Sequence, residues 1–203
     1  MNIEDGSDIL IEALEVFFNH ILYIREMYPM QIFKKRRIYN TPIYVSIFPP
    51  LNTYFFKVLQ AARELIRNGE LQKIELLFYR DELVFYERYN FQLSHIELSA
   101  VCAELQSECK DRFLLNFEEQ LRAALYKLAE RVKPLQKLEN DAKFKVLLHT
   151  TQAAFVRLTQ NSNYQEFPWL HESLQIVANN KEIALLPLSS VDSLGIQISA
   201  EVF

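Results

Sequence analysis

Apolar residues recur along the chain with helical spacing in some stretches and strand-like alternation in others. From Ile9 to Met27 they leave only a narrow polar stripe, which predicts a helix that is buried on most sides. We expect Ser7 or Asp8 to cap its start, because both side chains accept hydrogen bonds from free backbone amides. We expect Pro29 to end it, because proline restricts the preceding residue and lacks a backbone donor.

Two further long stretches have helical spacing. One begins at Pro49, where proline suits the first turn, and should stop at Gly69. The other spans residues 111–132 and is followed by Pro134. Residues 95–108 extend this third helix or form a separate short one.

The remaining apolar segments alternate or are short, as strands do. Residues 74–79 and 83–89 flank a polar turn and predict an antiparallel hairpin. Residues 143–149 fit a mostly buried strand, and residues 183–188 and 194–199 fit two short strands in the tail. Because helices and strands do not alternate as βαβ units, the pattern favours an α+β fold over a parallel sheet.

Composition sets outer limits on this fold. The 203 residues, 50% of them hydrophobic, are enough for one domain over 1–203. The net charge of −4 and the pI near 5.7 argue against a surface for sequence-independent phosphate binding, so we expect no direct nucleic-acid binding. Cys102 and Cys109 are interpreted as reduced thiols. The acidic amino terminus and the lack of a long apolar run predict a soluble, non-secreted protein without a membrane span.

One basic run, Lys34 to Arg37, interrupts this acidic background between the first two helices. Nuclear import machinery recognises such runs. The alternative is a solvated loop.

Familiar catalytic patterns are missing from the sequence. Three glycines, Gly6, Gly69 and Gly195, cannot form a phosphate-binding loop of the known kinds. His171 and Glu172 lack the second histidine that a zinc-binding helix needs. We therefore predict no cofactor, no metal and no enzymatic activity, while an enzyme with a site assembled from distant residues stays an alternative.

Several sequence blocks point to a known family. Ile21 to Pro29, with Ile32-Phe33 and the basic run into Tyr39-Asn40, resembles the first helix and loop of the HORMA-domain accessory subunit of DNA polymerase zeta. Further blocks match in order, and they are Leu51-Asn52-x-Tyr54, Glu119 to Ala123, Val146 to Thr150, Phe167-Pro168-Trp169 and Leu185 to Leu188. Together they span residues 9–199.

The resemblance implies a fold and a way of working. Three helices would pack on an antiparallel sheet, with a core over about residues 7–150 and a C-terminal "safety belt" over about 151–203 that wraps around a bound peptide. The partner would add a strand to a sheet edge. Tyr54 and Trp169 match the aromatic residues that hold a proline-containing peptide of the polymerase catalytic subunit. Otherwise, Tyr54 belongs to the core and Trp169 fills a gap.

The resemblance implies further contacts as well. Leu185 and Gln197 match positions that bind the C-terminal domain of the scaffold translesion polymerase, although Ser199 replaces a family tyrosine there. Arg122 matches an arginine used in HORMA dimerisation, and its alternative is an ordinary exposed helix arginine. An ATP-driven HORMA remodeller is a further possible partner.

The implied function is that of a non-catalytic adaptor in translesion synthesis and DNA repair, located in the nucleus and also in the cytoplasm. Two alternatives stay open beside the composite enzyme. One is another HORMA role, such as checkpoint control or DNA-end protection. The other is a protein that only stabilises its partner during folding.

Overall fold

The computed structural model describes residues 6–38, 40–81, 84–93, 98–107, 110–161, 169 and 184–203. In chain order the elements are α1 (Gly6–Ile24), η1 (Met30–Ile32), β1 (Phe33–Ile38), β2 (Thr41–Ser46), α2 (Pro49–Arg67), β3 (Lys73–Tyr79), β4 (Phe85–Gln92), α3 (Leu98–Gln106), α4 (Lys110–Val132), β5 (Lys143–His149), α5 (Gln152–Gln160), β6 (Ala184–Val191), η2 (Asp192–Leu194) and β7 (Ile196–Val202).

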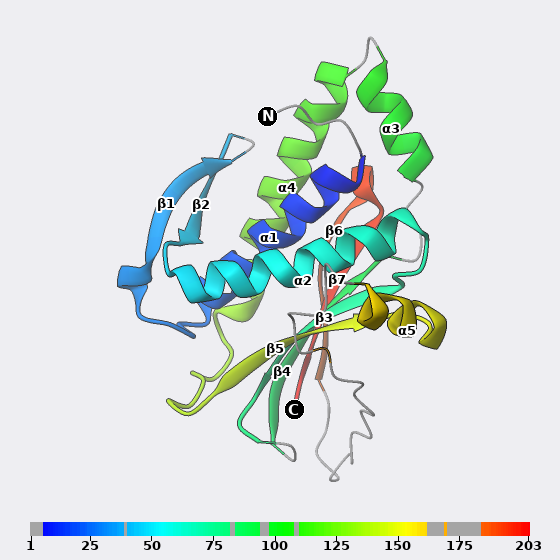
Figure 1. The fold of residues 1–203 in the computed structure, drawn as a ribbon. Coiled ribbons are helices and arrows are strands. Elements are labelled where there is room, and N and C mark those ends of the chain that lie inside the picture. Colours follow the sequence, from blue (N-terminus) through cyan, green and yellow to red (C-terminus); the bar gives the residue numbers. More distant parts are fainter. Residues whose placement is uncertain are drawn as a thin grey trace.

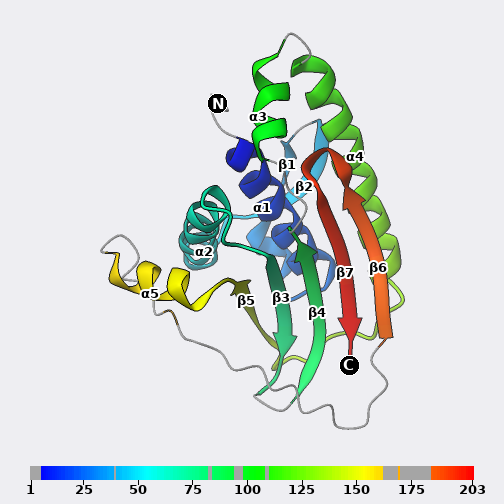
Figure 2. The same ribbon diagram turned by 90° about the vertical axis from the view of Figure 1, so that its right-hand side faces the viewer.

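Five strands form one sheet in the order β5-β3-β4-β7-β6, and every neighbouring pair is antiparallel. Helices α2, α1 and α4 lie across one face of this sheet (Figures 1 and 2). Among the described residues, strands β1 and β2 pair only with each other, and they form a separate ribbon beside α1. The predicted α+β fold, with three long helices on an antiparallel sheet, is confirmed.

The core lies between the helices and this face of the sheet. Alternate side chains of each strand point to the same face, so β3 contributes Ile74, Leu76 and Phe78, all at most 1% exposed. They pack in the same core as a cluster of aromatic rings through which α1 and α2 contact β4. The cluster consists of Phe17, Phe18, Phe55 and Phe91. Burying these large rings supplies most of the apolar contact that holds the layers together.

The first helix is buried on most sides, as predicted, but both of its predicted ends are wrong. Ser7 and Asp8 lie inside the first turn, where they contact Arg67 and Arg63 of α2. The helix ends at Ile24, well before Pro29. Its last turn is closed by amides that bond back to the carbonyls of Leu22 and Tyr23, with Glu26 in the left-handed region at φ 51°.

Two other segments differ from the sequence predictions, and a third, residues 98–106, follows one of the two alternatives predicted for it. Lys34 to Arg37 form most of strand β1 and are not a loop. Helix α5 was not predicted, although Thr151 accepts a hydrogen bond from the amide of Ala154 as an N-cap does. Residues 98–106 form a helix of their own, and α4 begins at Lys110. Both predicted ends of α2, and strand β5 as a whole, are confirmed.

Candidate functional site

The two edges of the five-stranded sheet differ in their capacity to accept another strand. Strand β6 contains Pro187, which has no backbone donor, and its register with β7 shifts between Pro187 and Ser189. Such features protect an edge from pairing. Strand β5 pairs regularly with β3 over all seven of its residues, and its sequence contains no proline. Strand β5 is therefore the edge suited to strand addition.

Tyr54 of α2 reaches this edge. The amide of Val146 donates a hydrogen bond to the Tyr54 hydroxyl over 3.0 Å, and the Tyr54 ring packs edge-on against Phe144 with 5.7 Å between centroids. Burial raises the pKa of the Tyr54 phenol, and the Val146 amide partly opposes this. The hydroxyl therefore stays neutral near pH 7 and keeps its proton while it accepts the Val146 bond.

The Val146 bond identifies which backbone groups of β5 face away from β3. In an antiparallel strand, the amide and carbonyl of one residue point to the same side, and those of the next residue point to the other side. Phe144, Val146 and Leu148 therefore all direct these groups away from β3. Their side chains share the helix-facing side of the sheet, where Val146 is 8% exposed. A peptide paired with β5 would meet these three residues through its backbone and Tyr54 through its side chains.

The C-terminal hairpin, β6 and β7, is fixed to the middle of the sheet through β4. Strand β7 pairs with β4 from Glu87 opposite Val202 to Gln92 opposite Gln197. The carboxylate of Glu201 accepts hydrogen bonds from Arg88 over 3.0 Å and from Asn90 over 3.1 Å. These contacts hold the hairpin on the side of the sheet opposite to β5.

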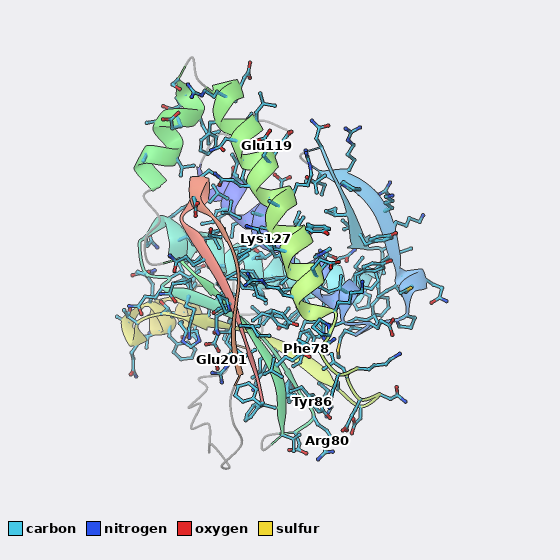
Figure 3. The ribbon with its side chains drawn as sticks, turned by 180° about the vertical axis from the view of Figure 1, so that it is seen from behind. Phe78, Arg80, Tyr86, Glu119, Lys127 and Glu201 are labelled. Carbon is cyan, nitrogen blue, oxygen red and sulfur yellow. The ribbon has the colours of Figure 1, made fainter. Side chains whose placement is uncertain are left out.

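Phe203 adds a second attachment at the end of the chain. Its amide donates to the carbonyl of Tyr86 over 3.1 Å, and its ring lies against Phe85 and under the guanidinium of Arg88, 5.3 Å from the ring centroid. Glu201, labelled in Figure 3, lies two residues earlier, in β7. Opening the hairpin would break all of these contacts together.

A buried ionic cluster connects the two halves of the sheet on the face away from the helices. Its centre is Glu75 of β3, 1% exposed, whose carboxylate lies 2.5 Å from Lys73, 3.2 Å from His149 of β5 and 3.5 Å from Arg88 of β4. Burial raises the pKa of the Glu75 carboxyl, but hydrogen bonds from His149 and Lys73 outweigh it and lower the pKa to about 2. Through Arg88 the cluster continues to Glu201.

Of the residues singled out from the sequence, Tyr54 and Trp169 pack against the core. Tyr54 is half-buried, as its core interpretation requires, and also lies at the β5 edge. Trp169 is half-buried. The residues on either side of Trp169 lie outside the described part of the chain.

The other predicted contact residues lie elsewhere. Leu185 is opposite Glu201 in the hairpin, whereas Gln197 is opposite Ser190, so the two lie about four residues, or roughly 13 Å, apart along it. Gln197 is exposed and Ser199 is half-buried. Arg122 is exposed on α4, one turn before the exposed Tyr126.

Groups that could hold a metal ion are not found among the described residues. No helix in the described ranges is long and apolar enough to cross a membrane. His171, Glu172 and Cys109, together with the side chain of Cys102, lie outside the described residues, so the predictions about them stay predictions.

A comparison with protein-family models matches the HORMA domain over residues 7–165. The chain belongs to the HORMA-domain family. It is 46% identical over 200 residues to DNA polymerase zeta subunit 2 of Drosophila melanogaster, which covers 98% of this chain and 97% of that one. It is 33% identical over 187 residues to the mitotic spindle assembly checkpoint protein MAD2B of Danio rerio, covering 92% and 85%. The resemblance to polymerase zeta subunits is thus confirmed.

Solved structures agree on the fold. A chain of the mitotic checkpoint complex matches with a TM-score of 0.73 at 20% identity, covering 97% of this chain and 96% of that one. Caenorhabditis elegans HTP-2, solved bound to an HTP-3 closure motif, matches with a TM-score of 0.69 at 17% identity, covering 98% and 88%. Helices and sheet are therefore those of a HORMA domain.

Proposed function

We propose that this protein is a non-catalytic adaptor subunit of DNA polymerase zeta that holds a peptide of the catalytic subunit against the edge of β5. The similarity over nearly the whole chain to a DNA polymerase zeta subunit supports the polymerase assignment. The observation that carries the peptide-binding mode is the edge of β5, whose Val146 amide donates to a tyrosine hydroxyl and to no strand in the described part of the chain.

Strand addition would proceed through the backbone of β5. An extended peptide would pair with the outward amides and carbonyls of Phe144, Val146 and Leu148, which gives affinity with little dependence on sequence. Selectivity would come from the Tyr54 ring, which can pack on a proline of the peptide. If two β5 edges paired antiparallel about Phe144, Lys143 of one copy would lie opposite Lys145 of the other, and like-charge repulsion would disfavour this register.

Closure would depend on the C-terminal segment. Helix α5 follows β5 directly, and β6 forms the opposite edge of the sheet, so residues 162–183 link the two edges. We propose that the C-terminal segment over about residues 151–203 acts as a safety belt for the bound peptide and that Trp169 contacts this peptide. The attachments of Glu201 and Phe203 to β4 would then have to break before the peptide is released. Closure would therefore act mainly by lowering the off-rate of the peptide.

Calorimetry tests this function. The full chain is titrated with fragments of its polymerase catalytic subunit that contain proline, beside Tyr54→Ala, Trp169→Ala and the control Phe56→Ala. Phe56 is 67% exposed on the same helix as Tyr54. We expect micromolar or tighter binding by the wild type and Phe56→Ala, and at least about 30-fold weaker binding by the other two, as for buried aromatic anchors. A folded wild type that binds no fragment would refute the proposal.

The bridging role is the second half of the proposal. We propose that Leu185 and the exposed Gln197 contact the scaffold polymerase. We also propose that Arg122 supports HORMA pairing and that the exposed basic run directs the protein to the nucleus. The half-buried Ser199 leaves the hairpin surface without the family tyrosine. Fluorescent fusions of the wild type and of a variant without the four basic charges would test the location.

A checkpoint role is a second candidate function, because relatives named for the mitotic spindle checkpoint cover most of this chain. Affinity purification from dividing cells separates the two. Recovery of polymerase subunits supports the adaptor, whereas recovery of checkpoint proteins alone supports the second candidate.

A further inference from the structure

The outer strand of the β1–β2 ribbon carries four consecutive cations, Lys34, Lys35, Arg36 and Arg37, and all four side chains are exposed. Strand β2 packs against α1, which leaves β1 as the outermost strand of the molecule on this side (Figure 1). Because side chains alternate along a strand, two cations lie on each face of the ribbon, and neighbours on one face are about 7 Å apart.

Nothing within the ribbon neutralises this charge. The cross-strand partners of the four cations are all uncharged, and they are Val45, Tyr44, Ile43 and Pro42. None of the four forms an ion pair with another residue that the structure describes. A ribbon stabilised by its own charges would place carboxylates opposite lysines and arginines. Here the four like charges repel one another, so they do not stabilise the ribbon.

The charge of the whole chain conceals this strip. Four of the 22 lysines and arginines lie here, which leaves 18 against 26 acidic residues, a balance of −8 elsewhere. Net charge predicted no nucleic-acid surface, but clustering on one face is what decides such binding. An acidic body would also orient a polyanion so that only the ribbon approaches it.

We propose that β1 binds the phosphate backbone of nucleic acid without reading its sequence. Lysine and arginine are donors only, and guanidinium groups match phosphate oxygens in pairs. Tyr44, opposite Lys35, is stacked on Tyr23 at 3.8 Å and 9°, so one face of its ring is already covered. Nucleic acid fits better than an acidic peptide, because it presents one negative charge per nucleotide in a line whatever its sequence.

The proposal predicts a specific salt dependence. Four phosphate contacts to a single strand give a slope of about −2.8 for log affinity against log salt, so affinity should fall about 50-fold between 50 and 200 mM salt. Duplex DNA should give a slope of about −3.6. Both slopes should be independent of base sequence.

Fluorescence anisotropy with a labelled 20-nucleotide single strand of mixed sequence tests this on the full 203-residue chain. The ribbon variant changes all four cations to glutamine. Its control changes four exposed cations of α4 in the same way, again two lysines and two arginines, namely Lys110, Arg112, Lys127 and Arg131. We expect the ribbon variant to lose at least about tenfold in affinity at 50 mM salt and most of its slope, and the control to stay within about twofold.

Four results would overturn the proposal. The first three are no binding by the wild type at 50 mM salt, full binding by the ribbon variant, and an equal loss of affinity in both variants. The fourth is displacement of the labelled oligonucleotide by poly-glutamate of equal charge at an equal or lower concentration. The last result would assign the ribbon to an acidic protein. If the fourfold variant fails to fold by circular dichroism, the same-face pairs Lys34/Arg36 and Lys35/Arg37 replace it, and each should halve the slope.

This inference does not depend on the polymerase assignment. The ribbon lies on α1, whereas the edge of β5 lies under Tyr54 of α2. Peptide binding should therefore be unchanged in the ribbon variant. Loss of oligonucleotide binding with peptide binding intact separates failure of one proposal from failure of the other.

Discussion

Removing the hydroxyl of Tyr54 while keeping its ring tests how the β5 edge is used. In the free protein this hydroxyl accepts the hydrogen bond of the Val146 amide over 3.0 Å. A peptide carbonyl that pairs with β5 would need the same amide. Tyr54→Phe therefore leaves a donor unpaired in the free protein and paired in the complex.

The magnitude follows from that single hydrogen bond. Its net contribution is about 1 kcal/mol, so Tyr54→Phe should lower the free energy of unfolding of the free protein by about 1 kcal/mol. The complex recovers this bond through the peptide, and peptide binding should tighten about fivefold. Tyr54→Ala also removes the ring that packs against Phe144, so its binding should weaken by about 2 kcal/mol, or roughly 30-fold.

Urea titration of the free proteins and calorimetry with one peptide measure both quantities. The two substitutions should change peptide affinity in opposite directions. If Tyr54→Phe weakens binding as much as Tyr54→Ala, the hydroxyl bonds to the peptide itself. If the affinity of Tyr54→Phe equals that of the wild type, the Val146 amide is not used. Either result would refute this use of the β5 edge.

Three further changes test other parts of the structure. Glu201→Gln weakens the bonds from Arg88 and Asn90, so peptide release followed by surface plasmon resonance should accelerate about tenfold, unlike that of the exposed control Glu130→Gln. Burial lowers the pKa of His20 to about 4, although the hydrogen bond to the Leu125 carbonyl opposes this shift. The free energy of unfolding should therefore fall by about 3 kcal/mol as the pH drops from 6.5 to 4. Urea titrations of His20→Gln should lack this loss. Glu26→Gly, at φ 51°, should raise the melting temperature slightly, since glycine adopts this conformation without strain; a lower melting temperature would contradict this.

The sign of the His20 effect follows from its two protonation states. Its folded pKa lies below the ordinary value of 6.5, so the fold favours the neutral ring. Above pH 6.5 the His20 ring is neutral in both the folded and the unfolded chain, so no stability is lost. Below this pH the unfolded chain binds a proton that the folded chain resists, and the penalty is complete below about pH 4. Equal pH profiles for His20→Gln and the wild type would contradict the assignment.

Elements with local signals were predictable from the sequence. Pro49 and Gly69 mark the ends of α2 because proline lacks the amide that a first helical turn leaves free and glycine adopts the left-handed conformation that follows a helix end. Strand β5 was predicted in full, since polar residues flank its apolar centre. The end of α1 was missed because Glu26 is not glycine and gives no local signal for its left-handed conformation.

Other features depend on residues far apart in the chain. Strand β1 lacks alternation because the four cations of its run occupy both faces. Helix α5 has only two buried residues, Ala154 and Leu158, so its period is weak, although Thr151 was a usable cap signal. The bond from Val146 to Tyr54 joins residues 92 positions apart, and sequence periodicity carries no information on such contacts.

The site residues divide in the same way. Tyr54 and Trp169 were suggested by resemblance to a family, and the packing of both against the core is consistent with either an anchor or a core role. Arg88 and Glu201 were not suggested, because ordinary charged residues on strands give no signal until the fold brings them together. Their link to Glu75 appears only in three dimensions.

The central claim is that a partner peptide adds a strand to β5, and amide exchange resolved by nuclear magnetic resonance tests it most directly. Exchange rates of β5 amides are compared in the free protein and in the complex with the tightest-binding fragment. The account predicts that protection rises at Phe144 and Leu148, which face outward, while Lys145 and Leu147, which face β3, change little. Protection that rises elsewhere, with Phe144 and Leu148 unchanged, would contradict it.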